Sequence, residues 1–249
     1  MTNDGVGDPE AAQLAVEELS VHFEGLAALA DVTLAVNRHE VFGLIGPNGA
    51  GKTTLVNCLT GFQRPTRGRV LLNGQNTAGW QPDYFRRAGV ARTFQAGRLF
   101  KDMTVIENVE VTATGLGFSR RVAADMAAKV LSWIELDDKA HLLASALAYT
   151  DQRRVSIARA LVVTPAFLLL DEPAAGMSDV ECEHLMALIQ SIPRTFGCGV
   201  LLIEHNMRVV MTISDRIHVL DGGRTIAEDS PDKIQRHEGV LAAYLGMEG

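Results

Sequence analysis

The chain has 249 residues, 47% hydrophobic and 21% charged, which is enough to bury a sizeable core as one large domain or two small ones. A net charge of −7 with a pI near 5.5 argues against a protein that coats nucleic acid, because such binders need a basic face. Three widely spaced cysteines (Cys58, Cys182 and Cys198) argue against a disulfide scaffold and indicate a reducing cytosol.

Residues 1–13 are polar and acidic, and we expect them to form a disordered tail ahead of one domain over residues 14–247. The tail lacks the apolar core of a secretory signal, and no run in the chain approaches the roughly 20 apolar residues that span a bilayer. Alternating apolar residues over 19–23 and again over 32–36 predict two half-buried strands in an antiparallel pair.

Three short apolar runs predict buried parallel strands. They are VFGLI (41–45), AFLLL (166–170) and GVLLI (199–203), and helical segments separate them. Continuous apolar runs of this length are typical of strands covered on both faces. The sequence therefore predicts an α/β core.

Between about residues 96 and 164 the strand signals stop and helix signals accumulate. A capping box at Thr104 and Glu107 and the amphipathic run VAADMAAKVLSWIEL predict an all-helical insertion. After it we expect a helix near 206–213, a strand RIHVL, a DGG turn and a final helix opened by Ser230 and Pro231.

The segment GLIGPNGAGKTTLVNCLTG carries the strongest chemical signal. Its glycines, lysine and threonine complete the pattern G-x-x-x-x-G-K-[ST] between a predicted strand and a predicted helix. Backbone N–H groups of such a loop surround the β-phosphate, Lys52 reaches the β and γ oxygens, and the Thr53 hydroxyl ligates Mg²⁺. The expected nucleotide contacts are Gly46, Asn48, Gly49, Ala50, Gly51, Lys52, Thr53 and Thr54.

Two predicted strands end on polar residues that suit phosphate hydrolysis. AFLLLDEP places Asp171 to hold the Mg²⁺ shell and Glu172 to face the attacking water as general base. VLLIEHN places His205 at the carboxyl end of a neighbouring strand, where it can bond the γ-phosphate.

Two further residues are weaker candidates. Gln95, in VARTFQ, begins the helical insertion and could reach Mg²⁺ or the attacking water. Phe23 has two roles open to it: it could stack on adenine, or it could continue the core alternation of Leu19 and Val21.

GPNGAGKTT, the Gln95 segment, LLLDEP and the histidine of IEH stand in the order found in the nucleotide-binding subunit of ATP-binding-cassette transporters. The chain resembles that family over about residues 14–247. ARTFQAGRLFKDMTVIENV, LLDEPAAGM, LLIEHNMRVVMTISDRIHVLDGG and AAYLG look like the ATPases of branched-chain amino-acid uptake systems.

The resemblance implies an α/β fold with a P-loop NTPase core, a mainly parallel sheet, an antiparallel β subdomain and an inserted α-helical subdomain. It implies ATP and Mg²⁺ as cofactors, and a homodimer or heterodimer of such ATPases that sandwiches two ATP molecules. It also implies two membrane-spanning permease subunits docked beside Gln95, an extracytoplasmic solute-binding protein, and a place on the cytoplasmic face of the plasma membrane. Nucleic acid is not an expected partner.

The stretch LAYTDQRR (147–154) departs from the family pattern Leu-Ser-Gly-Gly-Gln or Leu-Ser-Tyr-Gly-Gln, whose serine and glycine cap the γ-phosphate bound to the opposite subunit. Ala148 replaces the serine and removes its hydrogen bond to that γ-phosphate, which weakens the contact by about 1.5–3 kcal/mol. Thr150 adds a Cβ where the glycine backbone of the family approaches phosphate. Asp151 either faces the phosphate and repels it, or turns back and stabilises the helix start. Ser178 also replaces the usual Asp or Asn of a dimer contact.

These departures predict an asymmetric transporter, in which the ATP of the partner is hydrolysed slowly against this stretch. A simpler reading is that Thr150 and Asp151 form an ordinary helix cap. The alternative functions are an exporter ATPase of similar sequence, a non-transport cassette protein acting on ribosomes or DNA, and a regulatory subunit that scarcely hydrolyses ATP. Glu172 argues against the regulatory subunit, and the altered stretch argues for it.

Overall fold

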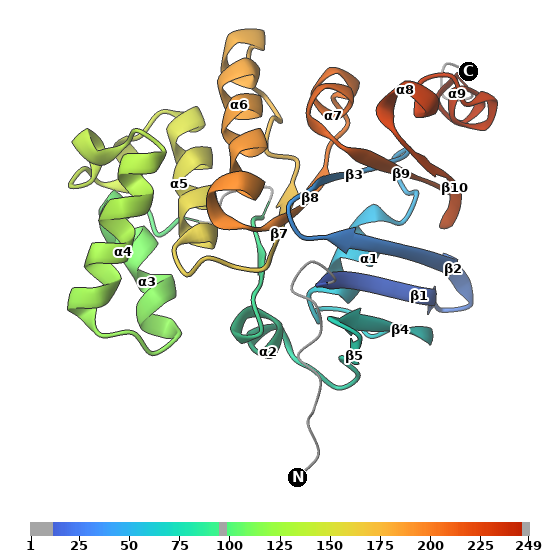
Figure 1. The fold of residues 1–249 in the computed structure, drawn as a ribbon, viewed down its shortest axis with the longest axis horizontal. Helices are drawn as coiled ribbons and strands as arrows, with labels where there is room; N and C mark the ends of the chain where they lie inside the picture. The colour runs from blue at the N-terminus through green and yellow to red at the C-terminus, as the bar shows by residue number, and fades with distance from the viewer. Residues whose placement is uncertain (1–11, 95–98, 246–249) are drawn as a thin grey trace.

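The computed structural model describes residues 12–94 and 99–245, which form two sheets and the helices around them (Figure 1). The first sheet opens with the predicted antiparallel pair, β1 (Gln13–Phe23) and β2 (Leu26–Asn37). Glu24 and Gly25 both have positive φ, 49° and 89°, which suits a two-residue hairpin turn. β1 begins one residue before the expected domain start at 14.

Two strands that the sequence did not reveal complete this sheet. They are β4 (Arg67–Leu72) and β5 (Gln75–Asn76), and the strand order is β2-β1-β4-β5. The β4 sequence RGRVLL does not alternate clearly between apolar and polar residues, and only Val70 and Leu72 are buried in it. Its pairing with β1 therefore depends on the tertiary fold more than on its own pattern.

The second sheet has six strands in the order β10-β9-β3-β8-β7-β6, and all its neighbouring pairs are parallel except β10 with β9. The predicted parallel strands and the mainly parallel α/β fold are confirmed. The strands are β3 (Val41–Ile45), β6 (Val90–Arg92), β7 (Phe167–Asp171), β8 (Gly199–Ile203), β9 (Arg216–Asp221) and β10 (Arg224–Asp229).

Both faces of this sheet are covered, which explains the unbroken apolar runs. In β7, Leu168 and Leu170 pack with the helical insertion and α6, whereas Phe167 and Leu169 pack with α1 and the antiparallel sheet. All four side chains are at most 1% exposed. β7 therefore runs through the centre of the core and delivers Asp171 at its carboxyl end.

The helical insertion lies to one side of the sheets in Figure 1 and consists mainly of α3 (Val105–Gly115), α4 (Arg120–Trp133) and α5 (Tyr149–Leu161). The predicted capping box is present, because Thr104 caps α3 and Glu107 bonds back to it. Residues 95–98, at its start, lie outside the described part of the chain.

The remaining helices pack around the six-stranded sheet, and none in the described residues is both long and apolar enough to cross a bilayer. The predicted single final helix is wrong: α8 ends at Ile234, and α9 begins at Glu238. The His237 ring accepts a hydrogen bond from the Val240 N–H at 3.3 Å, which starts a new helix. These helices are α1 (Lys52–Leu59), α2 (Pro82–Arg87), α6 (Asp179–Phe196), α7 (Met207–Ile213), α8 (Pro231–Ile234) and α9 (Glu238–Leu245).

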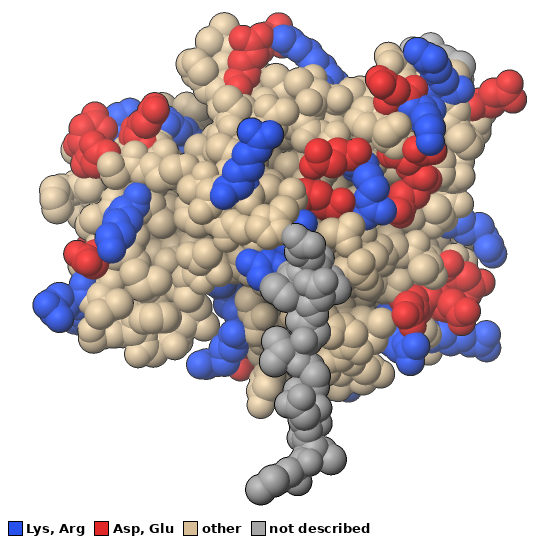
Figure 2. Space-filling view, viewed as in Figure 1, with Lys and Arg blue, Asp and Glu red and all other residues tan. Residues whose placement is uncertain are grey.

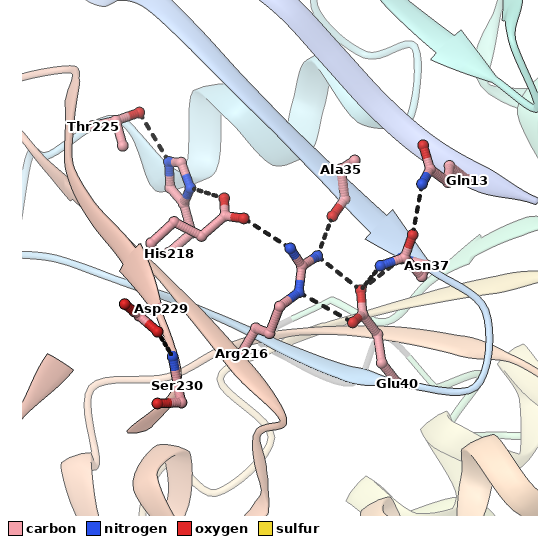
Figure 3. A network of polar contacts seen from close by, with 10 residues as sticks. Gln13, Ala35, Asn37, Glu40, Arg216, His218, Thr225, Asp229 and Ser230 are labelled. Atoms are coloured by element: carbon pink, nitrogen blue, oxygen red, sulfur yellow. Dashed lines mark hydrogen bonds and ion pairs between the residues drawn. The ribbon is translucent and has the colours of Figure 1, made fainter. Parts of the chain in front are cut away.

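A network of polar side chains joins the two sheets (Figure 3). Arg216 donates to the Ala35 carbonyl and pairs with Glu40 at 3.1 Å and Glu228 at 2.8 Å. The imidazole of His218, fully buried, lies 2.7 Å from Glu228. Acidic and basic side chains accordingly lie beside one another over this part of the surface in Figure 2. The network holds the β9–β10 edge against the antiparallel sheet.

Candidate active site

The glycine-rich loop joins β3 to α1, and its shape requires glycine at two positions. Gly46 has φ 151°, and a Cβ there would lie 2.0 Å from the Leu220 carbonyl oxygen. Gly51 caps α1 with φ 99°, and a Cβ there would lie 2.6 Å from the Ala28 carbonyl oxygen. The helix begins at Lys52. Its first N–H groups can therefore meet an anion at the loop.

Lys52 is bound by the loop itself. Its side-chain ammonium donates to the carbonyls of Gly46 at 2.7 Å and Pro47 at 2.9 Å, and the residue is only 8% exposed. Burial lowers the pKa of Lys52, while the carboxylates of Glu172 and Asp171 oppose that shift. The ammonium is thus held at the loop, within the field of both predicted acidic residues.

A cavity of about 210 Å³ opens beside the loop and brings most of the predicted nucleotide contacts together. Glu172 and Ile203 close it on the side of the parallel sheet. Gly46 and Asp171 are not in its lining. The cavity is lined by Ala28, Asn48, Gly49, Ala50, Gly51, Lys52, Thr53, Thr54, Glu172 and Ile203.

Asp171, the last residue of β7, faces an arginine that the sequence analysis did not single out. Arg92, at the end of β6, pairs with one Asp171 oxygen at 2.8 Å and with the Asn57 side chain at 2.6 Å. The backbone N–H of Asp171 donates to the Thr93 hydroxyl at 3.3 Å. The carboxylate is therefore oriented from the neighbouring strand.

Glu172 and His205 meet at the carboxyl ends of β7 and β8. The His205 Nε2 lies 3.0 Å from a Glu172 carboxylate oxygen. Glu172 adopts a left-handed backbone conformation, φ 48°, which is uncommon for a residue other than glycine. Its N–H donates to the Ile203 carbonyl at 2.9 Å, so β8 supports this turn. The strained turn separates the directions of the Asp171 and Glu172 side chains.

Glu204 holds the two site loops together, and the sequence analysis also missed it. This carboxylate is 1% exposed and accepts hydrogen bonds from the N–H groups of Ala174 at 2.7 Å and His205 at 3.2 Å. Burial raises the pKa of Glu204, and the backbone N–H groups oppose the shift. A buried carboxylate after a buried strand requires hydrogen-bond donors. The position of Glu204 directly after the apolar run GVLLI was therefore the signal in the sequence that could have identified it.

The raised pKa of Glu204 predicts a pH effect on stability. The folded protein binds the proton of this carboxyl more tightly than the unfolded chain, so its contribution to stability falls as pH rises from about 4.5. In Glu204→Gln this dependence disappears. The free energy of unfolding of the variant minus that of the wild type should therefore increase with pH, by at most about 1.4 kcal/mol per pH unit. Urea unfolding of both proteins between pH 4.5 and 7.5 measures it, and a constant difference would contradict it.

Two predicted site residues are not seen in the cavity lining: Phe23 is not among the lining residues, and Gln95 is not among the described ones. Phe23 is 47% exposed at the end of β1, whereas Leu19 and Val21 are fully buried, so the core role open to Phe23 is wrong. Phe23 is the last residue of β1, beside the hairpin turn, and it pairs with Leu26, which is 77% exposed. Gln95 lies in residues 95–98, outside the described residues.

The LAYTDQRR stretch enters α5, and the simple cap reading of Thr150 and Asp151 is wrong. Ala148 occupies the N-cap position without a side-chain hydrogen bond, and Thr150 lies in the first turn. Asp151 is 8% exposed and turns back into its own subunit, 2.6 Å from the Lys139 ammonium and 3.5 Å from Arg154. Of the two directions open to Asp151, the structure therefore shows the one away from an opposing phosphate.

Thr150 also needs no glycine-like backbone, because positive φ does not occur at this position. Its side chain lines a cavity of about 420 Å³ between α5 and α6, together with Met177 and Leu188. Ser178, before α6, forms a capping box with Glu181. What distinguishes the stretch is thus the missing hydroxyl at Ala148 and the added side chain at Thr150.

The donor set near the loop suits nucleotide phosphate and Mg²⁺. Positive φ at Gly49 and Gly51, 82° and 99°, belongs to a backbone curl whose N–H groups can face an anion. Mg²⁺ prefers oxygen ligands and takes one or two from protein when phosphate supplies others, which fits the Thr53 hydroxyl and the Asp171 carboxylate. Among the described residues no group of three or more His, Cys, Asp or Glu forms a self-sufficient metal site.

Comparisons with known proteins agree with this geometry. The family model described as ABC transporter matches residues 29–175, and that of a branched-chain amino acid ATP-binding cassette transporter matches residues 224–246. The high-affinity branched-chain amino acid transport ATP-binding protein LivG of Escherichia coli is 45% identical over 249 residues, covering 94% of this chain and 97% of the relative.

Two solved structures extend the likeness to the fold. The ADP conformation of MJ1267, an ATP-binding cassette of an ABC transporter, has a TM-score of 0.85 and 28% identity, covering 94% of this chain and 99% of that one. The dimeric structure of the cassette MJ0796 bound to ADP and Pi has a TM-score of 0.78 and 26% identity, with coverages of 88% and 98%.

Proposed function

This chain belongs to the ABC transporter family of ATP-binding cassettes, and from that membership we propose that it is the ATP-hydrolysing subunit of an importer for branched-chain amino acids or a related small solute. The observation that carries the hydrolytic role is the Glu172–His205 pair, 3.0 Å apart, beside the phosphate loop. The C-terminal match to branched-chain transporters supports an importer over an exporter.

The glycine-rich loop binds the β-phosphate of ATP through its backbone, and Lys52 moves from the Gly46 and Pro47 carbonyls to the β and γ oxygens. Thr53 and Asp171 would hold Mg²⁺, with Gln95 as the third expected contact. A Mg²⁺ ion held there would supply positive charge to the phosphate oxygens. Phe23, exposed at the end of β1, is available to stack on adenine.

Glu172 acts as the general base. Its carboxylate accepts a proton from a water as the water oxygen attacks the γ-phosphorus, and the bond from that phosphorus to the β–γ bridging oxygen breaks to release ADP and phosphate. His205, already bonded to Glu172, turns toward the γ-phosphate and orients the base. Glu204 fixes the loop that carries His205.

The partners follow from the same proposal. A second ATPase subunit faces the loop, in a homodimer or heterodimer, and two permease subunits dock from the membrane at its cytoplasmic face. We propose that the permease contact includes a groove of about 350 Å³ that is lined by Phe94 and Phe100, which flank residues 95–98 in the sequence, and by Arg86 and Arg159. A solute-binding protein delivers the solute from outside.

We also propose that, in a heterodimer with an ATPase of unaltered signature, the LAYTDQRR stretch makes the dimer asymmetric. Ala148 offers no hydroxyl to the partner's γ-phosphate, and the Thr150 side chain separates the helix backbone from it. Asp151 does not contribute repulsion, since Lys139 and Arg154 neutralise it. Two interactions with the γ-phosphate bound to the partner are therefore weakened. Ala148 lacks one charged hydrogen bond, and the Thr150 side chain keeps the helix backbone from approaching the phosphate. Each change weakens the interaction by roughly 1.5–3 kcal/mol.

The asymmetry predicts that Thr150→Gly raises ATP turnover by the purified chain at dimerising concentrations. We expect an increase of about tenfold, the equivalent of 1.4 kcal/mol in transition-state stabilisation, because glycine lets the helix start approach phosphate. Steady-state phosphate release with and without the partner ATPase measures it. Thr164→Gly, outside α5 and the cavities lined by the site residues, serves as the control. Equal turnover by wild type and Thr150→Gly would refute the asymmetric dimer.

The transport proposal itself is tested with the assembled transporter in proteoliposomes. Radiolabelled leucine, isoleucine or valine should accumulate only with Mg-ATP on the side of the ATPase, and the Glu172→Gln complex should not accumulate it. Hydrolysis that none of these solutes stimulates, in a complex that binds nucleotide, would reject the branched-chain class.

A further inference from the structure

Arg92 lies where three parts of the site meet. Its guanidinium is 2.8 Å from an Asp171 carboxylate oxygen, 2.6 Å from the Asn57 amide oxygen on α1, and 5.0 Å from the centre of the Phe94 ring. The Arg92 and Asp171 side chains are only 8% and 15% exposed. One arginine thus links the helix of the phosphate loop to the strand that carries the expected Mg²⁺ ligand.

This pair differs from an ordinary surface ion pair. A guanidinium does not lose its proton in proteins, so Asp171 always has a cation beside it. The Nε of Arg92 is buried and has no hydrogen-bond partner among the described residues, which is a cost that a purely structural arginine usually avoids. The position of the Arg92 guanidinium is therefore set by its contacts with Asp171 and Asn57, although one of its N–H groups stays without a hydrogen-bond acceptor.

Two cations interact with the Asp171 carboxylate. Arg92 binds one oxygen, and Mg²⁺ with its waters requires the same carboxylate when nucleotide binds. Two cations that share one carboxylate repel each other, and the low exposure of both side chains keeps water from screening them. Removing the arginine charge should therefore strengthen the hold of Asp171 on Mg²⁺.

We propose that Arg92 is the stand-in cation of the magnesium site: it neutralises and positions Asp171 when no Mg-nucleotide is bound, and it sets the Mg²⁺ concentration that nucleotide binding requires. The proposal rests on the proposed role of Asp171 as a magnesium ligand. Arg92 is a positioning residue, because it acts on Mg²⁺ through Asp171. A coupled consequence is that the free site stays closed to Mg²⁺ until phosphate adds its own oxygens.

The test measures ADP binding to the full-length protein as a function of the free Mg²⁺ concentration. Binding is monitored by the fluorescence of a labelled ADP and by thermal unfolding. Arg92→Met, which removes the charge, should lower the half-saturating free Mg²⁺ by about 5–10-fold. Arg92→Gln, which keeps a donor for Asn57 and serves if the Met variant folds poorly, should shift it in the same direction. Arg92→Lys, which keeps the charge, should stay within about twofold of wild type.

Two controls separate this effect from a structural one. Arg38 is another partly buried arginine, which donates to the Gly197 carbonyl at 2.8 Å and has no ion pair among the described residues. Arg38→Met should lower the unfolding temperature without moving the Mg²⁺ midpoint. In an Asp171→Asn background, Arg92→Met should no longer change the midpoint, because the shared carboxylate is gone.

An unchanged or raised Mg²⁺ midpoint in both Arg92→Met and Arg92→Gln would overturn the stand-in role, while Mg-dependent ADP binding by wild type would leave the proposed function intact. A wild-type protein whose ADP binding does not depend on Mg²⁺, or whose Mg²⁺ midpoint is not raised by Asp171→Asn, would instead remove the magnesium role of Asp171 and this proposal with it.

Discussion

Glu172→Gln is expected to lower ATP turnover by about 10²–10⁴-fold while nucleotide binding stays near the wild-type level. The glutamine amide cannot accept the proton of the attacking water, but its carbonyl oxygen can still bond His205, which lies 3.0 Å from the carboxylate. Glutamine has the same size as glutamate at the left-handed backbone position, so the turn after β7 should be preserved. Single-turnover hydrolysis beside equilibrium nucleotide binding separates chemistry from affinity.

Glu183→Gln is the matched control for that experiment. Glu183 lies on α6, more than half exposed, and pairs with Arg208 at 2.8 Å. The same change of charge there should leave turnover within about twofold, since surface ion pairs contribute little. If Glu172→Gln kept more than about a tenth of wild-type turnover, Glu172 would not be the general base, given the size of general-base effects.

Lys52→Ala is expected to weaken ATP binding by about 100-fold or more, because it removes at least one charge-assisted hydrogen bond to phosphate and the field of a buried cation. The loss is smaller than two full bonds, since the ammonium in the free protein already binds the Gly46 and Pro47 carbonyls and must leave them. The structural cost should be modest, because the variant also removes a charge that burial disfavours, as the lowered pKa of Lys52 shows.

Titration calorimetry with ATP and Mg²⁺ measures the change, and unfolding temperature without nucleotide checks the fold. Lys233→Ala on α8 is the control: its side chain is 71% exposed, pairs with Asp229 at 3.0 Å, and lies outside the cavity lining. ATP affinity of Lys52→Ala within about threefold of wild type would show that the loop backbone alone binds phosphate, against the expected worth of a charged hydrogen bond.

Lys52→Ala and Thr150→Gly affect different nucleotides, and together they test the proposed dimer. Lys52 acts on the nucleotide of its own subunit, whereas the LAYTDQRR stretch would act on the nucleotide of its partner. A complex in which Lys52→Ala abolishes hydrolysis at this chain's site, while Thr150→Gly accelerates hydrolysis at the partner's, would assign one defect to each site. Because the two residues face different nucleotides, their effects should add independently.

Much of the site is legible in the sequence because its signals are local. The loop from Gly46 to Thr53 needs glycines for its backbone and a lysine and threonine for its chemistry, all within eight positions. The apolar runs over 41–45, 166–170 and 199–203 predict buried parallel strands. Strands of that kind end at one edge of the sheet, and Glu172 and His205 accordingly meet there.

Long-range contacts, by contrast, have no local pattern. Arg92 and Asp171 are separated by 79 positions, and the pairing of β6 with β7 is what brings them together. The direction of Asp151 depends on Lys139, which packs beside the start of α5 from a separate 3₁₀ turn. Phe23 is exposed because it ends β1 beside the hairpin turn, opposite Leu26, which is 77% exposed.

The amino-acid sequence alone therefore specifies the phosphate loop, the parallel strands and the acids and histidine at their ends, since backbone conformation and burial periodicity depend on neighbouring residues. Packing of distant segments determines which charges those residues meet: Arg92 at Asp171, the backbone N–H groups at Glu204, and Lys139 at Asp151. Charge pairing and desolvation depend on positions in space, and these arise only when the strands and the helical insertion assemble around one core.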